Sequence, residues 1–231
     1  MAMAPSLPRR VAQCDPAAVP PLNSGDRLSR AEFHRRYLLH PEIEFAELVE
    51  GVVYVPSPAH HRSHGNSSFI VQGWLVRYLE NRAGIEGGNQ SSTFLDGDNE
   101  VRPDALLRYT DAPNRRSEIT EDDYLTGAPE LVVEIAASSA SYDLGDKLRA
   151  YRRNGVQEYI VWTTYENELY WFSLEDGEYL RLLPDDRGVI HSKVFPGLRL
   201  AVDRLLARDL DGVLAEQKRK ARGPRKPSAK G

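Results

Sequence analysis

The spacing of apolar residues predicts a helix and then a β-hairpin near the start of the chain. Ser29 and Glu32 have capping-box spacing, so a helix should run from there to Leu39. Apolar runs on both sides of a Glu-Gly pair predict a hairpin over residues 45–55. Apolar side chains that recur every three or four positions predict a second helix over residues 61–83, with Gly84 as its cap.

The remainder of the chain alternates between strand and helix patterns. The continuous apolar run at residues 130–135 is typical of a strand that is buried on both faces. We further expect strands at 91–95, 100–108, 158–164, 168–174 and 178–183, a polar loop with one helical turn at 110–128, and helices at 143–154 and 203–216. This order predicts an α/β fold, a mixed β-sheet flanked by helices, in which the unit 130–164 forms a parallel pair through a right-handed crossover.

Composition and charge divide the 231 residues into three parts. Residues 1–25 are rich in Pro and Ala and are expected to be disordered, and residues 26–217 are expected to form one folded domain. The formal net charge is −4, and the basic tail 218–231 contributes +7, which leaves −11 on residues 1–217. An acidic body argues against binding of nucleic acid over the whole surface. The tail could add non-specific attraction for phosphates, or it could be only a solvated end.

Two further features bear on the compartment. The chain has no apolar run long enough to span a membrane, and no apolar stretch follows Arg9 and Arg10 as in a secretory signal. Its single cysteine, Cys14, cannot form an intrachain disulfide and suits a reducing compartment. We therefore expect a cytoplasmic protein.

The candidate chemistry lies in two acidic residues and one basic residue. Glu134 interrupts the buried apolar strand, and Asp104 ends a short polar run. Lys147 lies thirteen residues after Glu134, on the next predicted helix. Two carboxylates and the backbone carbonyl of Ile135 could hold Mg²⁺, which prefers oxygen ligands and for which Mn²⁺ can substitute. Lys147 would then contact the attacking water or the phosphate. The pattern suggests phosphodiester hydrolysis assisted by a metal.

Simpler interpretations exist for each residue. Asp143 and Lys147 are four positions apart on one helix side, together with Tyr151, and could form an ordinary surface salt bridge. Glu134 could be a strand-end carboxylate that is paired with Arg149. His60, His61 and His64 lie close together, but no cysteine or second histidine pair completes a zinc site. We interpret them as loop and helix-start residues, with His64 near the cleft.

With these residues the chain resembles the Uma2 family of predicted restriction endonucleases, within the PD-(D/E)xK nuclease superfamily. The resemblance covers about residues 29–203 and lies in the segments 46–54, 57–58 with His64, 102–104, 130–135, 142–148 with Tyr151, 155–156 and 158–159. It implies a restriction-endonuclease-like fold. It also implies that Asp104 and Glu134 bind metal and that Glu47 is an additional active-site acid, although Glu47 could instead be a solvent-facing hairpin carboxylate.

The chain departs from the family pattern next to Glu134. Position 136, where the superfamily usually has its lysine, is Ala136, and the resemblance implies that Lys147 supplies this function from the next helix. Residues 137–139 read Ala-Ser-Ser where the family usually has Ser-Pro-Ser, and Gln157 replaces a proline. These changes leave the geometry of the active-site loop open.

The leading interpretation is therefore a Mg²⁺-dependent, restriction-type DNA endonuclease. A nuclease fold that binds nucleic acid or a protein partner without cleaving is the alternative, and an unrelated α/β protein with accidental matches is a third. DNA is the expected partner. A homodimer is the oligomer to consider, because a two-fold axis places two sites on opposite strands.

Overall fold

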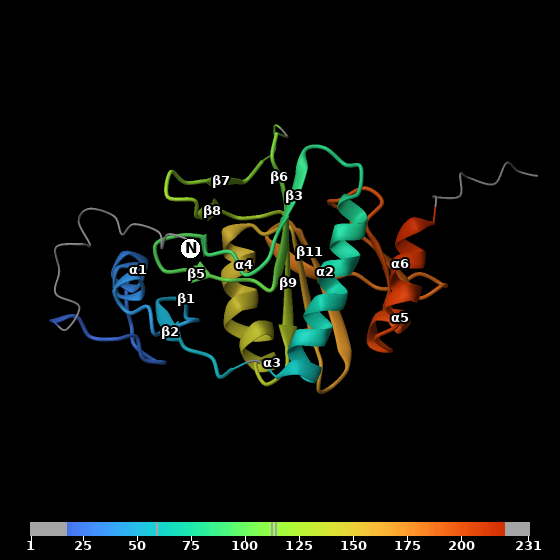
Figure 1. The fold of residues 1–231 in the computed structure, drawn as a ribbon. Coiled ribbons are helices and arrows are strands. Elements are labelled where there is room, and N and C mark those ends of the chain that lie inside the picture. Colours follow the sequence, from blue (N-terminus) through green and yellow to red (C-terminus); the bar gives the residue numbers. More distant parts are fainter. Residues whose placement is uncertain (1–17, 59, 112, 114, 220–231) are drawn as a thin grey trace, which may run out of the picture.

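The computed structural model describes residues 18–219 except 59, 112 and 114. Most of these residues belong to a domain built around two six-stranded sheets (Figure 1). The N-terminal residues 1–17, with Cys14, and residues 220–231 of the basic tail lie outside the described part. No helix in the described part is long and apolar enough to cross a membrane.

The central sheet carries the candidate site. Its strands, in spatial order, are β12 (Glu178–Arg181), β11 (Glu168–Glu175), β10 (Glu158–Thr163), β9 (Leu131–Ala136), β6 (Ala105–Tyr109) and β3 (Ile85–Gly88). Strand β9 is buried along its whole length, and it runs parallel to β10, as predicted from its apolar run. The neighbour on its other side, β6, is antiparallel to it. The carboxyl ends of β9 and β10 therefore lie together at one edge of the sheet.

The outer sheet is smaller and begins with the predicted hairpin. Its order is β2 (Val52–Tyr54), β1 (Glu47–Val49), β5 (Glu100–Val101), β4 (Thr93–Phe94), β8 (Leu125–Gly127) and β7 (Ser117–Ile119). Glu50 and Gly51 join β1 to β2 with φ values of 52° and 73°. Positive φ at both central residues is the signature of a tight hairpin turn that matches the strand twist.

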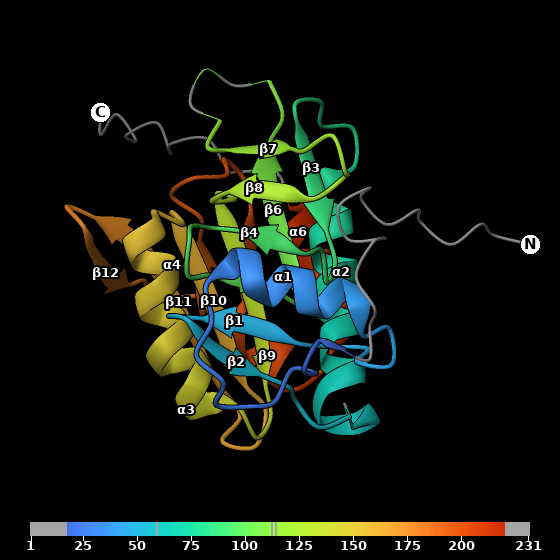
Figure 2. The ribbon, with the colours of Figure 1, turned by 90° about the vertical axis from the view of Figure 1, so that its left-hand side faces the viewer.

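Helices and the outer sheet cover the two faces of the central sheet (Figures 1 and 2). On one face lie α2 (Asn66–Leu79), α5 (Val202–Leu206) and α6 (Leu210–Lys218), and they enclose the largest apolar core. On the other face lie α3 (Ala140–Tyr142), the wider turn η3 (Asp143–Lys147) and α4 (Leu148–Asn154). Val49 and Val101 of the outer sheet share a second core with α4 and β9. Helix α1 (Arg30–Leu39) packs on the hairpin through Phe33.

The first helices confirm some predicted ends and correct others. The side chain of Ser29 accepts a hydrogen bond from the Glu32 N–H and caps α1, as predicted. The second predicted helix is instead a wide turn, η2 (His61–Gly65), followed by α2, which ends at Leu79. Gly84, with φ of 76°, does not cap this helix and instead precedes β3, a strand that the sequence did not predict.

Two predicted segments between residues 100 and 128 are wrong. The segment 100–108, predicted as a strand that Pro103 interrupts, is two strands, β5 and β6, which belong to different sheets. Pro103 lies at the break, because a proline cannot donate to a strand ladder. The segment 110–128, predicted as a loop with a helical turn, carries the strands β7 and β8.

Both ends of the domain also differ from the prediction. The helix predicted over 203–216 is the pair α5 and α6, and Arg208 between them has a positive φ of 56°. A short hairpin of β13 (Val189–His191) and β14 (Arg199–Ala201) precedes the pair and was not predicted. Within the segment 1–25, predicted as disordered, Val19 and Leu22 are buried, and Leu22 packs against α1 and the hairpin. The folded part therefore begins before residue 26.

Candidate active site

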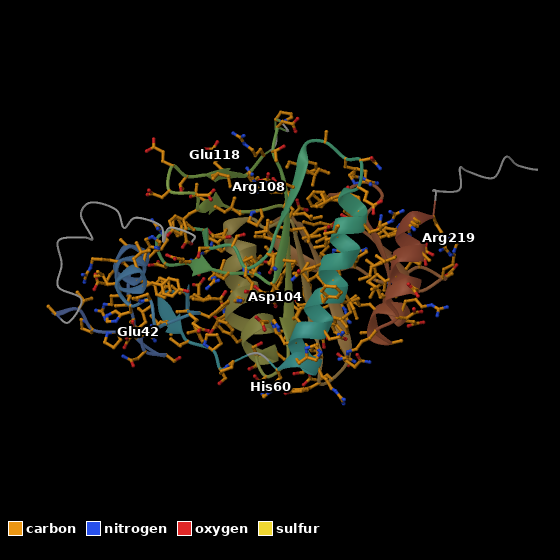
Figure 3. All side chains as sticks on the ribbon, in the orientation of Figure 1. Glu42, His60, Asp104, Arg108, Glu118 and Arg219 are labelled. Atoms are coloured by element: carbon orange, nitrogen blue, oxygen red, sulfur yellow. The ribbon has the colours of Figure 1, made fainter. Side chains whose placement is uncertain are left out.

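Asp104 and Glu134 lie next to each other on neighbouring strands of the central sheet. Strand β6 pairs with β9 in the register Ala105↔Val133, so Asp104, one residue earlier, lies opposite Glu134. Side chains of opposed residues in an antiparallel pair point to the same face and are close neighbours. Asp104 is further fixed because its Oδ2 accepts a hydrogen bond of 2.7 Å from the Ile135 N–H. Figure 3 labels Asp104 beside the lower half of α2.

Lys147 reaches these acids from the helical segment that follows β9. Its Nζ lies 2.9 Å from Glu134 Oε1, and the hydroxyl of Tyr151 donates to the same oxygen over 2.8 Å. Asp143, Lys147 and Tyr151 repeat every four residues and so share one side of the helix, as the sequence predicted. The last turn ends at Gly155, whose φ of 81° forms a left-handed cap.

Glu47 completes the cluster from the outer sheet. Its Oε2 lies 2.8 Å from Lys147 Nζ, and its Oε1 accepts a hydrogen bond of 2.7 Å from the Arg102 N–H. Only 4% of Glu47 and 4% of Lys147 is exposed to solvent. The interpretation of Glu47 as a solvent-facing hairpin carboxylate is therefore wrong. The hairpin brings Glu47 into direct contact with Lys147, although the two are far apart in the sequence.

The simpler pairings from the sequence account for little of this geometry. Lys147 Nζ lies 3.8 Å from Asp143 Oδ1, farther than from Glu47 or Glu134, so the four-residue salt bridge is its weakest contact. Arg149 is not the partner of Glu134; it pairs with Asp146 on the exposed side of the helix. The structure thus places Glu134 with Lys147 and Tyr151.

The cluster contains more acids than bases. Glu47, Asp104, Glu134 and Asp143 are all buried, and Lys147 is the one buried lysine among the described residues. Burial raises the pKa of Glu134 well above its usual value, against the opposing effect of Lys147. Burial also raises the pKa of Asp143 to about 6. Such a surplus of acids is what a bound cation would neutralise.

Lys147 is held in its charged form. Burial alone lowers the pKa of a lysine, but the carboxylates of Glu134, Glu47 and Asp143 outweigh this, and the pKa of Lys147 is raised well above its usual value. The ring of Tyr142 lies 5.5 Å from its Nζ. Lys147 can therefore act as a fixed positive charge or a hydrogen-bond donor, and not as a base.

Free oxygen atoms in this cluster suit a hard divalent cation. Glu134 Oε2 accepts no hydrogen bond from the described residues, whereas Oε1 accepts two. The N–H and C=O of a strand residue point to the same side of the strand. The Ile135 N–H donates to Asp104, so the Ile135 carbonyl also points toward the β6 side. Two carboxylates and a carbonyl are oxygen donors of the kind that Mg²⁺ accepts. The described residues contain no group of three or more His, Cys, Asp or Glu side chains arranged around a metal position.

His64 is the one member of the histidine cluster that contacts these acids. Its Nε2 lies 3.1 Å from Asp104 Oδ1, and this contact raises the pKa of His64. His60 and His61 lie at the start of η2 and do not form a zinc site with it. Spacing alone could not reveal the contact between His64 and Asp104, because 40 residues separate them. Tyr151, which the sequence placed on the same helix side as Lys147, contacts Glu134.

Comparisons with known proteins agree with this fold. No curated protein matches the chain. The crystal structure of "a putative nuclease belonging to DUF820" from Anabaena variabilis ATCC 29413 superposes with a TM-score of 0.55 and 14% sequence identity. The match covers 71% of this chain and 90% of that one, and at this identity it shows a shared fold.

A family match covers most of the chain. Residues 30–203 match the family Uma2, described as "Putative restriction endonuclease". The match includes both sheets and every residue of the acidic cluster, which excludes the unrelated α/β protein considered above. The chain belongs to the Uma2 family.

Proposed function

We propose that this protein is a metal-dependent endonuclease that hydrolyses phosphodiester bonds of DNA at the cluster of Glu47, Asp104, Glu134 and Lys147. The observation that carries the proposal is the position of Lys147 Nζ, 2.8 Å from Glu47 and 2.9 Å from Glu134, at the strand edge that also holds Asp104. Acids beside a fixed ammonium group are the groups needed to hold a cation next to a phosphate. Membership of the Uma2 family supports the nuclease activity.

Each residue has a separate task in this proposal. Asp104, Glu134 and the Ile135 carbonyl supply the oxygen atoms that would hold Mg²⁺, with Mn²⁺ as a substitute. Such a metal would lower the pKa of a bound water and neutralise charge on the phosphate. Lys147 stabilises negative charge on the phosphate, because its neighbouring acids keep it protonated. Glu47 positions Lys147 through an ion pair, and Tyr151 positions Glu134 through a hydrogen bond.

The test is DNA cleavage by the purified full chain with Mg²⁺ or Mn²⁺, compared with Glu134→Gln and Asp104→Asn. The glutamine side chain in Glu134→Gln keeps an acceptor for Lys147 and Tyr151 but removes the charge, so the fold should survive. We expect cleavage to fall by about 100-fold or more in both variants, the size of effect seen when preorganised electrostatic groups are removed.

A matched control is Glu158→Gln. Glu158 also has a buried carboxylate, but in the sheet it lies opposite Leu131, at the other end of β9. Its carboxylate accepts a hydrogen bond from the Ser192 hydroxyl. This variant should cleave DNA at the wild-type rate once its folding is verified by circular dichroism. Equal cleavage by Glu134→Gln and wild type would contradict the proposed site, as would equal loss in the control.

A second function, binding without cleavage, is favoured by one observation. The described side chains form no group of three metal-binding residues, and Lys147 already neutralises two of the acids. Titration calorimetry with Mn²⁺ separates the two functions. A nuclease site should bind Mn²⁺, and Asp104→Asn should weaken this binding, whereas a non-cleaving module should give no heat at this site.

A further inference from the structure

A basic pocket lies at the end of the central sheet where β9 and β10 finish, and it is not used by the function proposed above. It has a volume of about 660 Å³ and is lined by His61, Arg62, Ser63, Asn66, Thr164, Tyr165 and Arg208. These residues come from η2, the start of α2, the turn after β10 and the loop between α5 and α6. We refer to them as the basic pocket. Figure 3 places the neighbouring His60 at the lower end of the molecule, below Asp104.

The basic pocket adjoins the strand edge that carries the site. The Thr164 N–H donates to the Ala136 carbonyl over 2.8 Å, two residues beyond Glu134. On its other wall, Arg62 precedes by two residues His64, which contacts Asp104. The pocket therefore lies at the carboxyl ends of the parallel strands β9 and β10, where ligands bind in many open α/β sheets.

No described residue forms an ion pair with the arginines of the basic pocket. Its lining contains two arginines and a histidine but no acidic residue. Most arginines of the described domain form ion pairs, whereas Arg62 and Arg208 form none with any described residue. The Arg208 guanidinium lies 5.4 Å from the Trp162 ring, a contact that positions the side chain but leaves its charge free. In an acidic body such a concentration of unpaired cations favours an anionic ligand.

An exposed aromatic ring stands at the same pocket. Tyr165, in the turn between β10 and β11, is 62% exposed to solvent. Burying the ring on a ligand would gain free energy, and a nucleobase offers a flat apolar face of suitable kind. Arginines for phosphate and an aromatic ring for a base are the two parts of a surface that binds a single nucleic-acid strand.

We propose that the basic pocket is a binding subsite for an unpaired DNA strand next to the cleavage position. Arg62 and Arg208 contact a backbone phosphate that neighbours the one at the acidic cluster, and Tyr165 stacks on the adjacent base. This inference rests on the proposed function for its choice of DNA as the ligand. It adds that bases beside the cut are unpaired when bound, so single-stranded or frayed DNA binds better than a closed duplex.

Binding is measured without cleavage, by fluorescence anisotropy of labelled oligonucleotides with the full chain in EDTA, over a range of salt concentrations. Each lost phosphate contact lowers the slope of log affinity against log salt by about 0.7 for a single strand. Because both arginines contact the same phosphate, Arg62→Gln with Arg208→Gln should reduce the slope by about 0.7. The control, Arg27→Gln with Arg181→Gln, removes two exposed arginines that lie outside the basic pocket and should leave the slope unchanged.

The stacking contact is tested with Tyr165→Ala and Tyr165→Phe. Loss of one stacked base should weaken binding of the single strand about tenfold in Tyr165→Ala, and phenylalanine should restore it. A hairpin duplex with closed ends should lose much less affinity. Because Tyr165 is exposed in a turn, neither variant should change the urea midpoint of unfolding.

The outcomes separate this inference from the nuclease proposal. A protein that binds single strands through these residues but never cleaves would support the subsite and contradict the nuclease. Cleavage by the wild type, with unchanged binding and salt slope in Arg62→Gln with Arg208→Gln, would overturn the subsite alone. No binding of either DNA by the wild type would also overturn it, and so would equal losses for single strand and duplex in Tyr165→Ala.

Discussion

Replacement of Lys147 by methionine tests how strongly the buried cluster depends on a single positive charge. Methionine keeps most of the volume and the unbranched chain of lysine but removes the ammonium group. Glu47 and Glu134 would then lose their closest cation, at 2.8 and 2.9 Å, while both stay buried. The structure offers no replacement among the described residues, since Arg149 points to Asp146 instead.

The expected loss is large because the remaining carboxylates stay in a region of low polarity. Removal of one partner from a buried ion pair typically costs about 3–5 kcal/mol of unfolding free energy. The matched control is Lys193→Met, because Lys193 forms an ion pair with Glu175 while 54% of its side chain is exposed. An exposed pair of this kind contributes about 1 kcal/mol or less.

The loss should also depend on pH, with a definite sign. Burial raises the pKa of Glu134 above its value in the unfolded chain, and removal of Lys147 raises it further. A carboxyl group with a raised folded-state pKa favours folding below its unfolded pKa, and this contribution is lost as the pH rises through the folded value. The difference between Lys147→Met and wild type should therefore be larger at pH 8 than at pH 5.

Urea denaturation at both pH values, followed by far-ultraviolet circular dichroism, measures these free energies. Equal losses of unfolding free energy in Lys147→Met and Lys193→Met at pH 8 would contradict the role of Lys147. A loss in Lys147→Met that grew toward pH 5 would contradict the predicted sign. In a background of Glu134→Gln the loss from Lys147→Met should shrink, because one of the stranded charges has already been removed.

Two further predictions test the metal ligands and the outer sheet. Mg²⁺ at about ten times its dissociation constant should add about 1.4 kcal/mol of stability, which calorimetry would show as a rise in Tm of a few degrees. Asp104→Asn should abolish this rise. An unchanged rise in Asp104→Asn would show that Asp104 does not bind the metal. Gly127→Ala should destabilise the protein by about 2 kcal/mol, because Gly127 has φ of 83° and a Cβ there would collide with the Arg116 carbonyl. Gly97→Ala, where a Cβ meets nothing within 4 Å, should change the urea midpoint little, and equal effects of the two would contradict the packing described here.

The parts of the fold that the sequence predicted are those with strong local patterns. The run from Leu131 to Ala136 has no polar residue except Glu134, so a strand buried on both faces was the natural prediction, and β9 confirms it. The hairpin at Glu50-Gly51 and the cap at Ser29 follow from backbone and side-chain chemistry over a few residues. Local physics is sufficient for such elements.

The strands that could not be predicted from the sequence depend on contacts between distant segments. Strands β7 and β8 are three residues each, and they are held by pairing with each other and with β4. Ile85–Gly88 forms β3 although its burial pattern shows no buried residue, because it pairs with β6. Short strands of this kind have too few apolar residues for a periodic signal, and their partners decide their structure.

The candidate site divides in the same way. The side shared by Asp143, Lys147 and Tyr151 follows from helix geometry and was visible in the sequence. The approach of Glu47 to Lys147 requires that the outer sheet folds back on the helix, and only the family resemblance, not the local pattern, indicated it. The contact between His64 and Asp104 likewise depends on where η2, which carries His64, packs at the start of β6.

The most direct test of the central claim is anomalous X-ray diffraction from crystals of the protein grown with Mn²⁺. We expect one strong peak within coordination distance, about 2.2 Å, of carboxylate oxygens of both Asp104 and Glu134, with the Ile135 carbonyl as a further ligand. Lys147 should remain beside Glu47. Manganese bound only elsewhere on the protein, or no peak at these two acids at saturating Mn²⁺, would contradict the account.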